Sequence, residues 1–133
     1  MPKAVSSDSP ERFEGHIPPG ALLNAFNTSD RINRYLIENL PLDAWKAKPV
    51  EGKGRTIAAI VAHMHNVRVM WLKATKYEEI PPQLDRSTVT PAQALRGLEG
   101  SCQALSVVLA RAIAGDGQIR NFAPMWPDFS AIS

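Results

Sequence analysis

The residues with the clearest capacity for chemistry are two histidines, His63 and His65, inside the apolar run from Thr56 to Lys76. A neutral imidazole can ligate a divalent metal ion or transfer a proton. Histidines that chelate one ion from a single helix are three or four residues apart, because that spacing places both rings on one side. The HxH spacing puts them roughly 200° apart. The pair therefore cannot chelate one ion from this helix, and each is interpreted as a packing residue or as a single ligand.

Two further groups of residues suggest chemistry less directly. Cys102 lies within a regular series of leucines, so we interpret it as a small core residue and not as a nucleophile. Four cationic residues form a local basic cluster, Lys46, Lys48, Lys53 and Arg55. Only Trp45 lies near this cluster, and no strand or recognition helix carries it. We interpret it as a solvated loop between helices and predict no nucleic-acid binding.

The segment from Gly52 to Thr56, GKGRT, resembles a phosphate-binding loop in composition. It lacks the GxxxxGK[ST] spacing and follows no predicted strand. We therefore predict a glycine turn that leads into Thr56 as the N-cap of a helix.

Length and composition indicate a single soluble globular domain. The chain has 133 residues, of which 44% are hydrophobic and 21% charged, with a formal net charge of +2. No segment approaches the roughly 18 uninterrupted apolar residues of a membrane span, and no secretory signal precedes the domain. The single cysteine excludes an intramolecular disulfide and fits a reducing compartment. These features predict a cytoplasmic protein that does not bind membranes.

Apolar periodicity predicts an all-α fold with three long helices. The first spans Ala21 to Leu40 and places on one face Leu22, Phe26, Leu36, Ile37 and Leu40. Ser29 and Asn33 lie in the middle of that face, and Asn33 is predicted to bond across the core or to line a cavity. Pro41 ends this helix, and Trp45 is the predicted anchor of the connection that follows.

The second and third helices are also predicted from their spacing. The second spans Thr56 to Lys76 and is expected to bury Ile57, Ile60, Val61, Met64, Val67 and Trp71. The third follows Thr90 as N-cap, with Pro91 at the first position and Gln93 closing a capping box. Its predicted seam is Leu95, Leu98, Cys102, Leu105, Leu109 and Ala112. We predict a disordered tail at residues 1–18, a helical domain at 19–117 and an irregular segment at 118–133.

Taken in order, several of these segments resemble the DinB-like (DinB/YfiT) family of bacterial four-helix bundles. They are LPLDAWKAKP after the first helix, the lead-in GRTI, and IVAHMHNVR with MWL in the second helix. The resemblance covers Ala21 to Phe122. It implies a bundle that holds zinc or nickel on three histidines, one from the second helix and two from an HxxxH motif on the fourth. It also implies a small-molecule or thiol substrate and a thiol-dependent transferase or hydrolase-like activity.

His63 matches the family's second-helix ligand, but no histidine follows His65. We therefore predict a bundle that lacks its fourth helix, holds no metal ion tightly and exposes apolar seams. Three outcomes stay open: the three helices close on themselves, form a homodimer through the seam of the third helix, or fail to fold stably. Two function classes follow. The chain is an incomplete or inactive metal-dependent enzyme with substrate entering near Asn33 and Asn66, or it is a non-catalytic interaction or dimerisation module.

The C-terminal residues Met125 to Ser133 suggest a reason for this departure. Their codons, read from one nucleotide upstream, permit Asp-Val-Ala-Gly-Phe-Phe-Ser-Tyr-Leu, which resembles the continuation in family members. We hypothesise that this segment is an out-of-frame reading of the start of the fourth helix.

Overall fold

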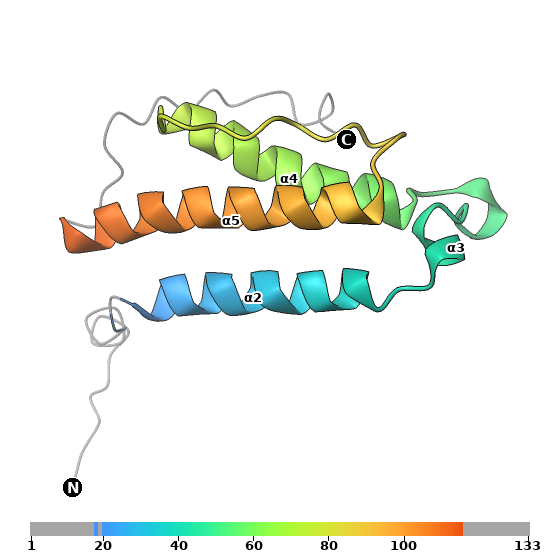
Figure 1. Ribbon diagram of the computed structural model, residues 1–133, viewed down its shortest axis with the longest axis horizontal. Coiled ribbons are helices and arrows are strands. Elements are labelled where there is room, and N and C mark those ends of the chain that lie inside the picture. Colours follow the sequence, from blue (N-terminus) through green and yellow to red (C-terminus); the bar gives the residue numbers. More distant parts are fainter. Residues whose placement is uncertain (1–17, 19, 116–133) are drawn as a thin grey trace, which may run out of the picture.

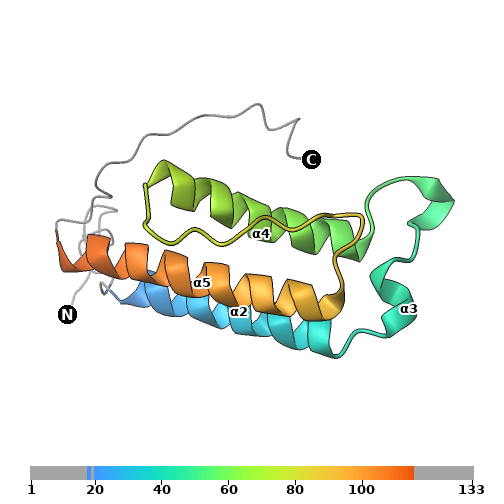
Figure 2. The ribbon, with the colours of Figure 1, turned by 45° about the horizontal axis from the view of Figure 1, so that its top comes forward.

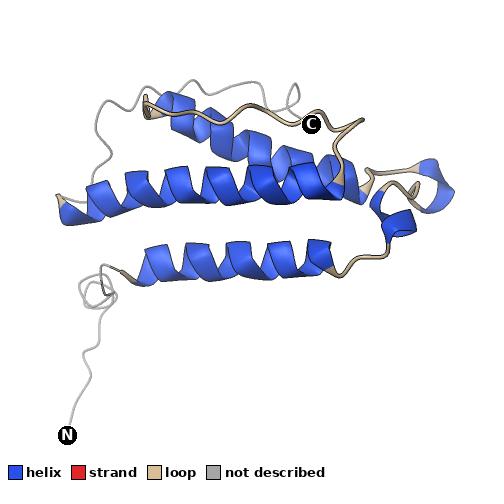
Figure 3. Cartoon of the chain, viewed as in Figure 1, coloured by secondary structure: helices blue, strands red, loops and turns tan. Residues whose placement is uncertain are grey.

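The computed structural model describes residue 18 and residues 20–115, and every regular element among them is helical (Figure 3). The elements follow in the order α2 (Ala21–Glu38), α3 (Leu42–Trp45), the 3-10 turn η1 (Val50–Gly52), α4 (Ile57–Ala74) and α5 (Pro91–Ala114). The predicted all-α class and the three long helices are confirmed. The predictions for residues 1–17 and for residues after 115, including the out-of-frame hypothesis, lie outside the described residues.

Helix α5 lies between the other two long helices and packs against both α2 and α4 (Figure 1). The connection from α4 to α5 runs back along the bundle beside α4 and α5 (Figure 2). None of the helices in the described part of the chain is long and apolar enough to cross a lipid bilayer.

The predicted helix boundaries agree with the structure to within about two residues, as is usual for helix ends. The Thr56 hydroxyl accepts a hydrogen bond from the Ala59 N–H at 3.1 Å. Thr90 and Gln93 form both bonds of the predicted capping box, with Pro91 in the first turn. Gly52 and Gly54 have φ of +70° and +94°, which L side chains adopt at a steric cost. The glycine turn before α4 is therefore confirmed.

The largest apolar cluster lies where α3 meets the starts of α4 and α5. It contains Ile37, Trp45, Ala58, Val61, Ala62, Val89, Ala94 and Leu98. The indole Nε1–H of Trp45 donates to the Val89 carbonyl at 2.8 Å in this buried environment. Trp45 thus joins the connection before α4 to Val89, directly before the N-cap of α5, and its predicted anchoring role is confirmed.

The prediction of which residues of α4 are buried is wrong in part. Ile57 and Ile60 are 36% and 45% exposed, whereas His65 and Arg68 are buried. The side of α4 turned into the bundle instead carries small residues such as Ala58 and Ala62, both fully buried. Small side chains allow close helix approach, so Ala58 and Ala62 are buried where Ile57 and Ile60 were expected.

The predicted face of α2 needs the same correction. Leu22 and Leu36 are 68% and 58% exposed, whereas Ile37 and the carboxylate of Asp30 are buried. Asn33 is half-buried. The buried polar residue in the middle of this helix is thus Asp30, which lies on the same inner side of α2 as Ile37.

Candidate functional site

The centre of the bundle contains a buried ion pair between α2 and α4. Asp30 is 1% exposed. Arg68 Nη1 donates to its Oδ1 at 2.9 Å, and Arg34 Nε donates to its Oδ2 at 2.8 Å. A buried carboxylate is costly unless it is paired and hydrogen-bonded. Asp30 meets this requirement with two guanidinium groups, one from its own helix and one from α4.

Arg68 extends this network to α5. Its Nη1 also lies 3.0 Å from the Leu98 carbonyl and 3.3 Å from the Ser101 hydroxyl. The guanidinium carbon lies 5.2 Å from the ring centroid of Phe26, a cation–π distance. Arg68 therefore contacts both other long helices and fixes their positions relative to α4.

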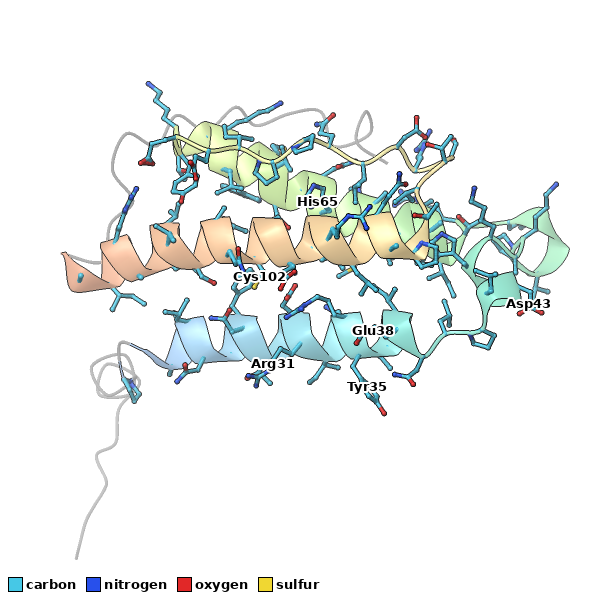
Figure 4. The ribbon with its side chains drawn as sticks, viewed as in Figure 1. Arg31, Tyr35, Glu38, Asp43, His65 and Cys102 are labelled. Atoms are coloured by element: carbon cyan, nitrogen blue, oxygen red, sulfur yellow. The ribbon has the colours of Figure 1, made fainter. Side chains whose placement is uncertain are left out.

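His65 continues the network toward the connection between α4 and α5 (Figure 4). The ring is fully buried, with Nε2 at 2.7 Å from the Pro82 carbonyl oxygen and Nδ1 at 3.1 Å from the Ser101 hydroxyl. A carbonyl oxygen can only accept, so the proton is assigned to Nε2 and Nδ1 accepts from Ser101 in the neutral ring. Both ring nitrogens are used within the protein, so His65 is a packing residue.

Asn66 holds the same connection at Leu84. Its side-chain NH2 donates to the Leu84 carbonyl at 2.9 Å, and its Oδ1 accepts from the Leu84 N–H at 2.8 Å. This amide replaces the backbone partner that an irregular segment lacks. Asn66 thus holds the connection in place, and the suggested substrate entry near Asn33 and Asn66 stays a prediction.

Cys102 lies between α5 and α2, as Figure 4 shows. It is buried, and its thiol donates to Asn27 Oδ1 at 3.4 Å, which also accepts from Ser106 at 3.2 Å. Burial, and then the negative charge of Asp30, raises the pKa of the Cys102 thiol. A protonated, buried thiol is a poor nucleophile. These observations support the interpretation of Cys102 as a core residue.

His63, the predicted metal ligand, is half-buried in the middle of α4, two residues before His65. Within residues 18 and 20–115, no three side chains of histidine, cysteine, aspartate or glutamate form a group that could hold a metal ion. A zinc site needs at least three protein ligands. The described residues thus do not fit the family's three-histidine centre, and the role of His63 stays a prediction.

Sequence reasoning missed the central pair of Asp30 and Arg68. One signal was present: Arg68 is the only charged residue between Thr56 and Leu72, a stretch otherwise suited to a core helix. Asp30 and Arg34 also have the four-residue spacing of a helical ion pair. The arrangement as a whole serves the positioning of helices, since its donors and acceptors are directed at one another.

Comparison with known proteins identifies the family of the chain. The family model of the DinB family matches residues 12–119. No curated protein and no solved structure matches. The matched region includes all the helices described above and agrees with the resemblance noted from the segments around Trp45 and His63. This chain is a member of the DinB family.

Proposed function

We propose that this chain is a DinB-family helical module that acts by association with a second copy of itself, through an apolar stripe on α2. The observation that carries the proposal is the position of that stripe. Its residues, at alternating steps of three and four, are Leu22, Ala25, Ser29, Ile32 and Leu36, and all are exposed.

The stripe is large enough to contribute useful binding energy. Leu22, Ile32 and Leu36 are 68%, 55% and 58% exposed. Full burial of one such side chain gives about 1.5–3 kcal/mol. Two copies of the stripe packed against each other would therefore bury six large apolar side chains across one interface.

A second copy of this chain is the simplest partner for the α2 stripe. Most soluble oligomers are symmetric, and a two-fold axis pairs the same patch on both subunits. Two α2 helices packed antiparallel would match the two stripes residue for residue. The formal net charge of +2 opposes this association only weakly.

Sedimentation equilibrium over a range of protein concentrations tests the proposal. The wild type is expected to dimerise, and Leu36→Glu is expected to weaken the dimer because it places a charge in the apolar interface. Arg31→Gln is the matched control, because it lowers the net charge by the same amount and Arg31 points away from α5 on another side of α2 (Figure 4). A monomer at every concentration, or equal dimer strength in wild type and Leu36→Glu, would contradict the proposal.

A second candidate function is the family's metal-dependent thiol chemistry, with His63 as one ligand of a zinc or nickel ion. Family membership and the match of His63 to the second-helix ligand support it. The remaining ligands would come from outside the described residues. The chemistry that such an ion supplies is a lowered pKa of a bound thiol or water.

Calorimetric titration with zinc and nickel separates the two candidates. One weak binding event that disappears in His63→Ala is expected if His63 is a ligand. Equal heats from wild type and His63→Ala would dismiss its metal role. A full equivalent of tightly bound metal in the purified protein would instead favour the enzymatic candidate over a purely associative module.

A further inference from the structure

A hollow of about 350 Å³ lies between the connection from α3, the start of α4 and the turn at residues 86–87. We call it the basic hollow. Four cationic residues line it, Lys46, Lys48, Arg55 and Arg86, together with Thr56 and Ser87. No carboxylate is among the described residues of its lining, and the nearby Asp85 Oδ1 accepts a hydrogen bond from the Ser87 N–H at 2.7 Å. The sequence pattern indicated only part of this arrangement, because Arg86 joins from a distant segment and Lys53 of the basic cluster does not line the hollow.

The walls of the basic hollow are joined by bonds that do not depend on a ligand. Lys46 Nζ donates to the Ser87 carbonyl at 3.0 Å. The adjacent Trp45 donates to the Val89 carbonyl at 2.8 Å, in the buried cluster below. The connection that carries Lys46 and Lys48 is thereby held against the turn that carries Arg86.

The electrostatics of the hollow favour an anion. Lys46, Lys48 and Arg55 bring like charges to one concave surface, and an anion placed among them lowers their mutual repulsion. Thr56 is the N-cap of α4, so the positive end of the α4 dipole also lies at this wall. The helix end only adds to the effect, since the cations come from three separate segments of the chain.

We propose that the basic hollow binds the phosphate group of a small phosphorylated molecule. Arginine binds phosphate through paired N–H donors, and two arginines are present here. A volume of about 350 Å³ exceeds that of a phosphate ion and falls at the lower end of the range for small-molecule sites. The remaining space therefore accommodates a group about the size of a sugar.

The shape of the site favours a small ligand over a nucleic acid. The four cations converge on one hollow, whereas a nucleic-acid backbone is followed by cations spread along a groove or a helix. The inference is independent of the proposed dimer and of the role of His63, because neither the α2 stripe nor His63 lines the basic hollow.

Titration calorimetry at about 0.15 M salt tests the inference. The probes are glucose 6-phosphate, inorganic phosphate, glucose and a single-stranded oligonucleotide. Glucose 6-phosphate is expected to bind with one site per chain and more tightly than inorganic phosphate, and glucose is expected not to bind. Each of Lys48→Gln and Arg55→Gln is expected to weaken glucose 6-phosphate binding about tenfold, as for loss of one charge-assisted contact.

Lys53→Gln is the matched control, because it removes the same charge from the same basic cluster outside the hollow. His63→Ala is a second control, so failure of the metal candidate does not affect the result. Both controls are expected to bind as the wild type, and circular dichroism checks that each variant is folded. No binding of glucose 6-phosphate, an equal loss in Lys53→Gln, or tighter binding of the oligonucleotide would overturn the inference.

Discussion

The inner side of α2 combines the buried Ile37 with a buried charge, whereas its outer side carries exposed apolar side chains. The side that contributes to the centre carries the buried carboxylate of Asp30, whereas the outer stripe carries the exposed Leu22, Ile32 and Leu36. Helix α4 shows a similar contrast, with Arg68 buried and Ile60 exposed. A helix in a bundle usually turns its apolar stripe to the core. Here a polar network joins the three long helices beside the apolar clusters, and part of the apolar surface of α2 remains exposed.

The contrast also shows what each surface contributes. The inner network is paired in detail, and the described residues contain no buried side-chain nitrogen or oxygen without a hydrogen-bond partner. Such a network specifies one arrangement but is expensive to break. The outer stripe contributes little to the single chain while it remains exposed, and its apolar area becomes favourable only on association.

The largest expected effect comes from breaking the inner network at Arg68. Arg68→Ala is expected to lower the free energy of unfolding by about 3–5 kcal/mol, because Asp30 remains buried with one partner fewer. Urea denaturation followed by circular dichroism measures the change. The double variant Asp30→Leu/Arg68→Met removes both charges and is expected to be more stable than the single variant. A double variant less stable than Arg68→Ala would show that the pair itself, and not the lone buried charge, dominates.

A smaller loss in the free energy of unfolding is expected from a change at His65, at the other end of the network. His65→Ala removes one partner of the Ser101 hydroxyl and the side-chain partner of the Pro82 carbonyl, and it leaves a cavity. A loss of about 2–4 kcal/mol in the free energy of unfolding is therefore expected. Hydrogen exchange at the backbone amides of residues 83–85 should increase at the same time, because His65 holds this connection at the Pro82 carbonyl. His63→Ala, at a half-buried position, serves as the comparison. An equal loss in both variants would contradict the assignment of His65 as the core histidine.

Two glycines of α5 differ in how closely they are packed. Changing each to alanine adds a single methyl group and tests this difference. A Cβ at Gly97 would lie 3.0 Å from Leu84 Cδ1 and 3.4 Å from His65 Nδ1, whereas one at Gly100 would meet no atom within 4 Å. Gly100→Ala is therefore expected to stabilise the protein by about 1 kcal/mol through helix propensity. Gly97→Ala is expected to stabilise the protein by less, because the Leu84 side chain must move to make room for the added methyl group. The two thermal midpoints check this order, and a larger gain at Gly97 would show that the inner packing is loose.

The smallest effect is expected at the exposed ion pair of Glu78 and Arg111, the counterpart of the buried pair in the centre. The hydrogen bond from Arg111 is the main cause that lowers the pKa of Glu78 below its ordinary value of 4.5. A lowered pKa stabilises the fold above the ordinary value and loses that contribution as the pH falls through the folded value. Both side chains are exposed, so the effect is small. Thermal midpoints of wild type and Glu78→Gln should therefore differ slightly at neutral pH and converge in acid, and a difference that grows in acid would contradict this sign.

Local signals in the sequence were sufficient for much of the fold. Thr56, Thr90 and Pro91 mark helix starts because capping depends on residues a few positions apart. Trp45 was recognisable as an anchor because a large apolar side chain between two helices requires burial. The order of the segments around Trp45 and His63 was sufficient to suggest the DinB family.

The buried faces could not be inferred from the same pattern. Both α2 and α4 have an apolar stripe beside a partly polar side, and periodicity predicts that the more apolar side is buried. Asp30 and Arg68 are buried beside apolar neighbours because each supplies the partner that the other needs, and the pairing of residues 38 positions apart is not visible in local spacing. The basic hollow has the same origin, since Arg86 approaches Arg55 only after the chain folds.

The amino-acid sequence by itself determined where the three long helices begin and end, and which family the chain belongs to, because propensity, capping and motif order are local properties. Only the tertiary structure decided that His65 is the core histidine and that Asp30 meets Arg68. It also decided that the leucines of α2 remain outside. These outcomes depend on which side chains meet across helices, and that is set by the packing of α5 between its neighbours.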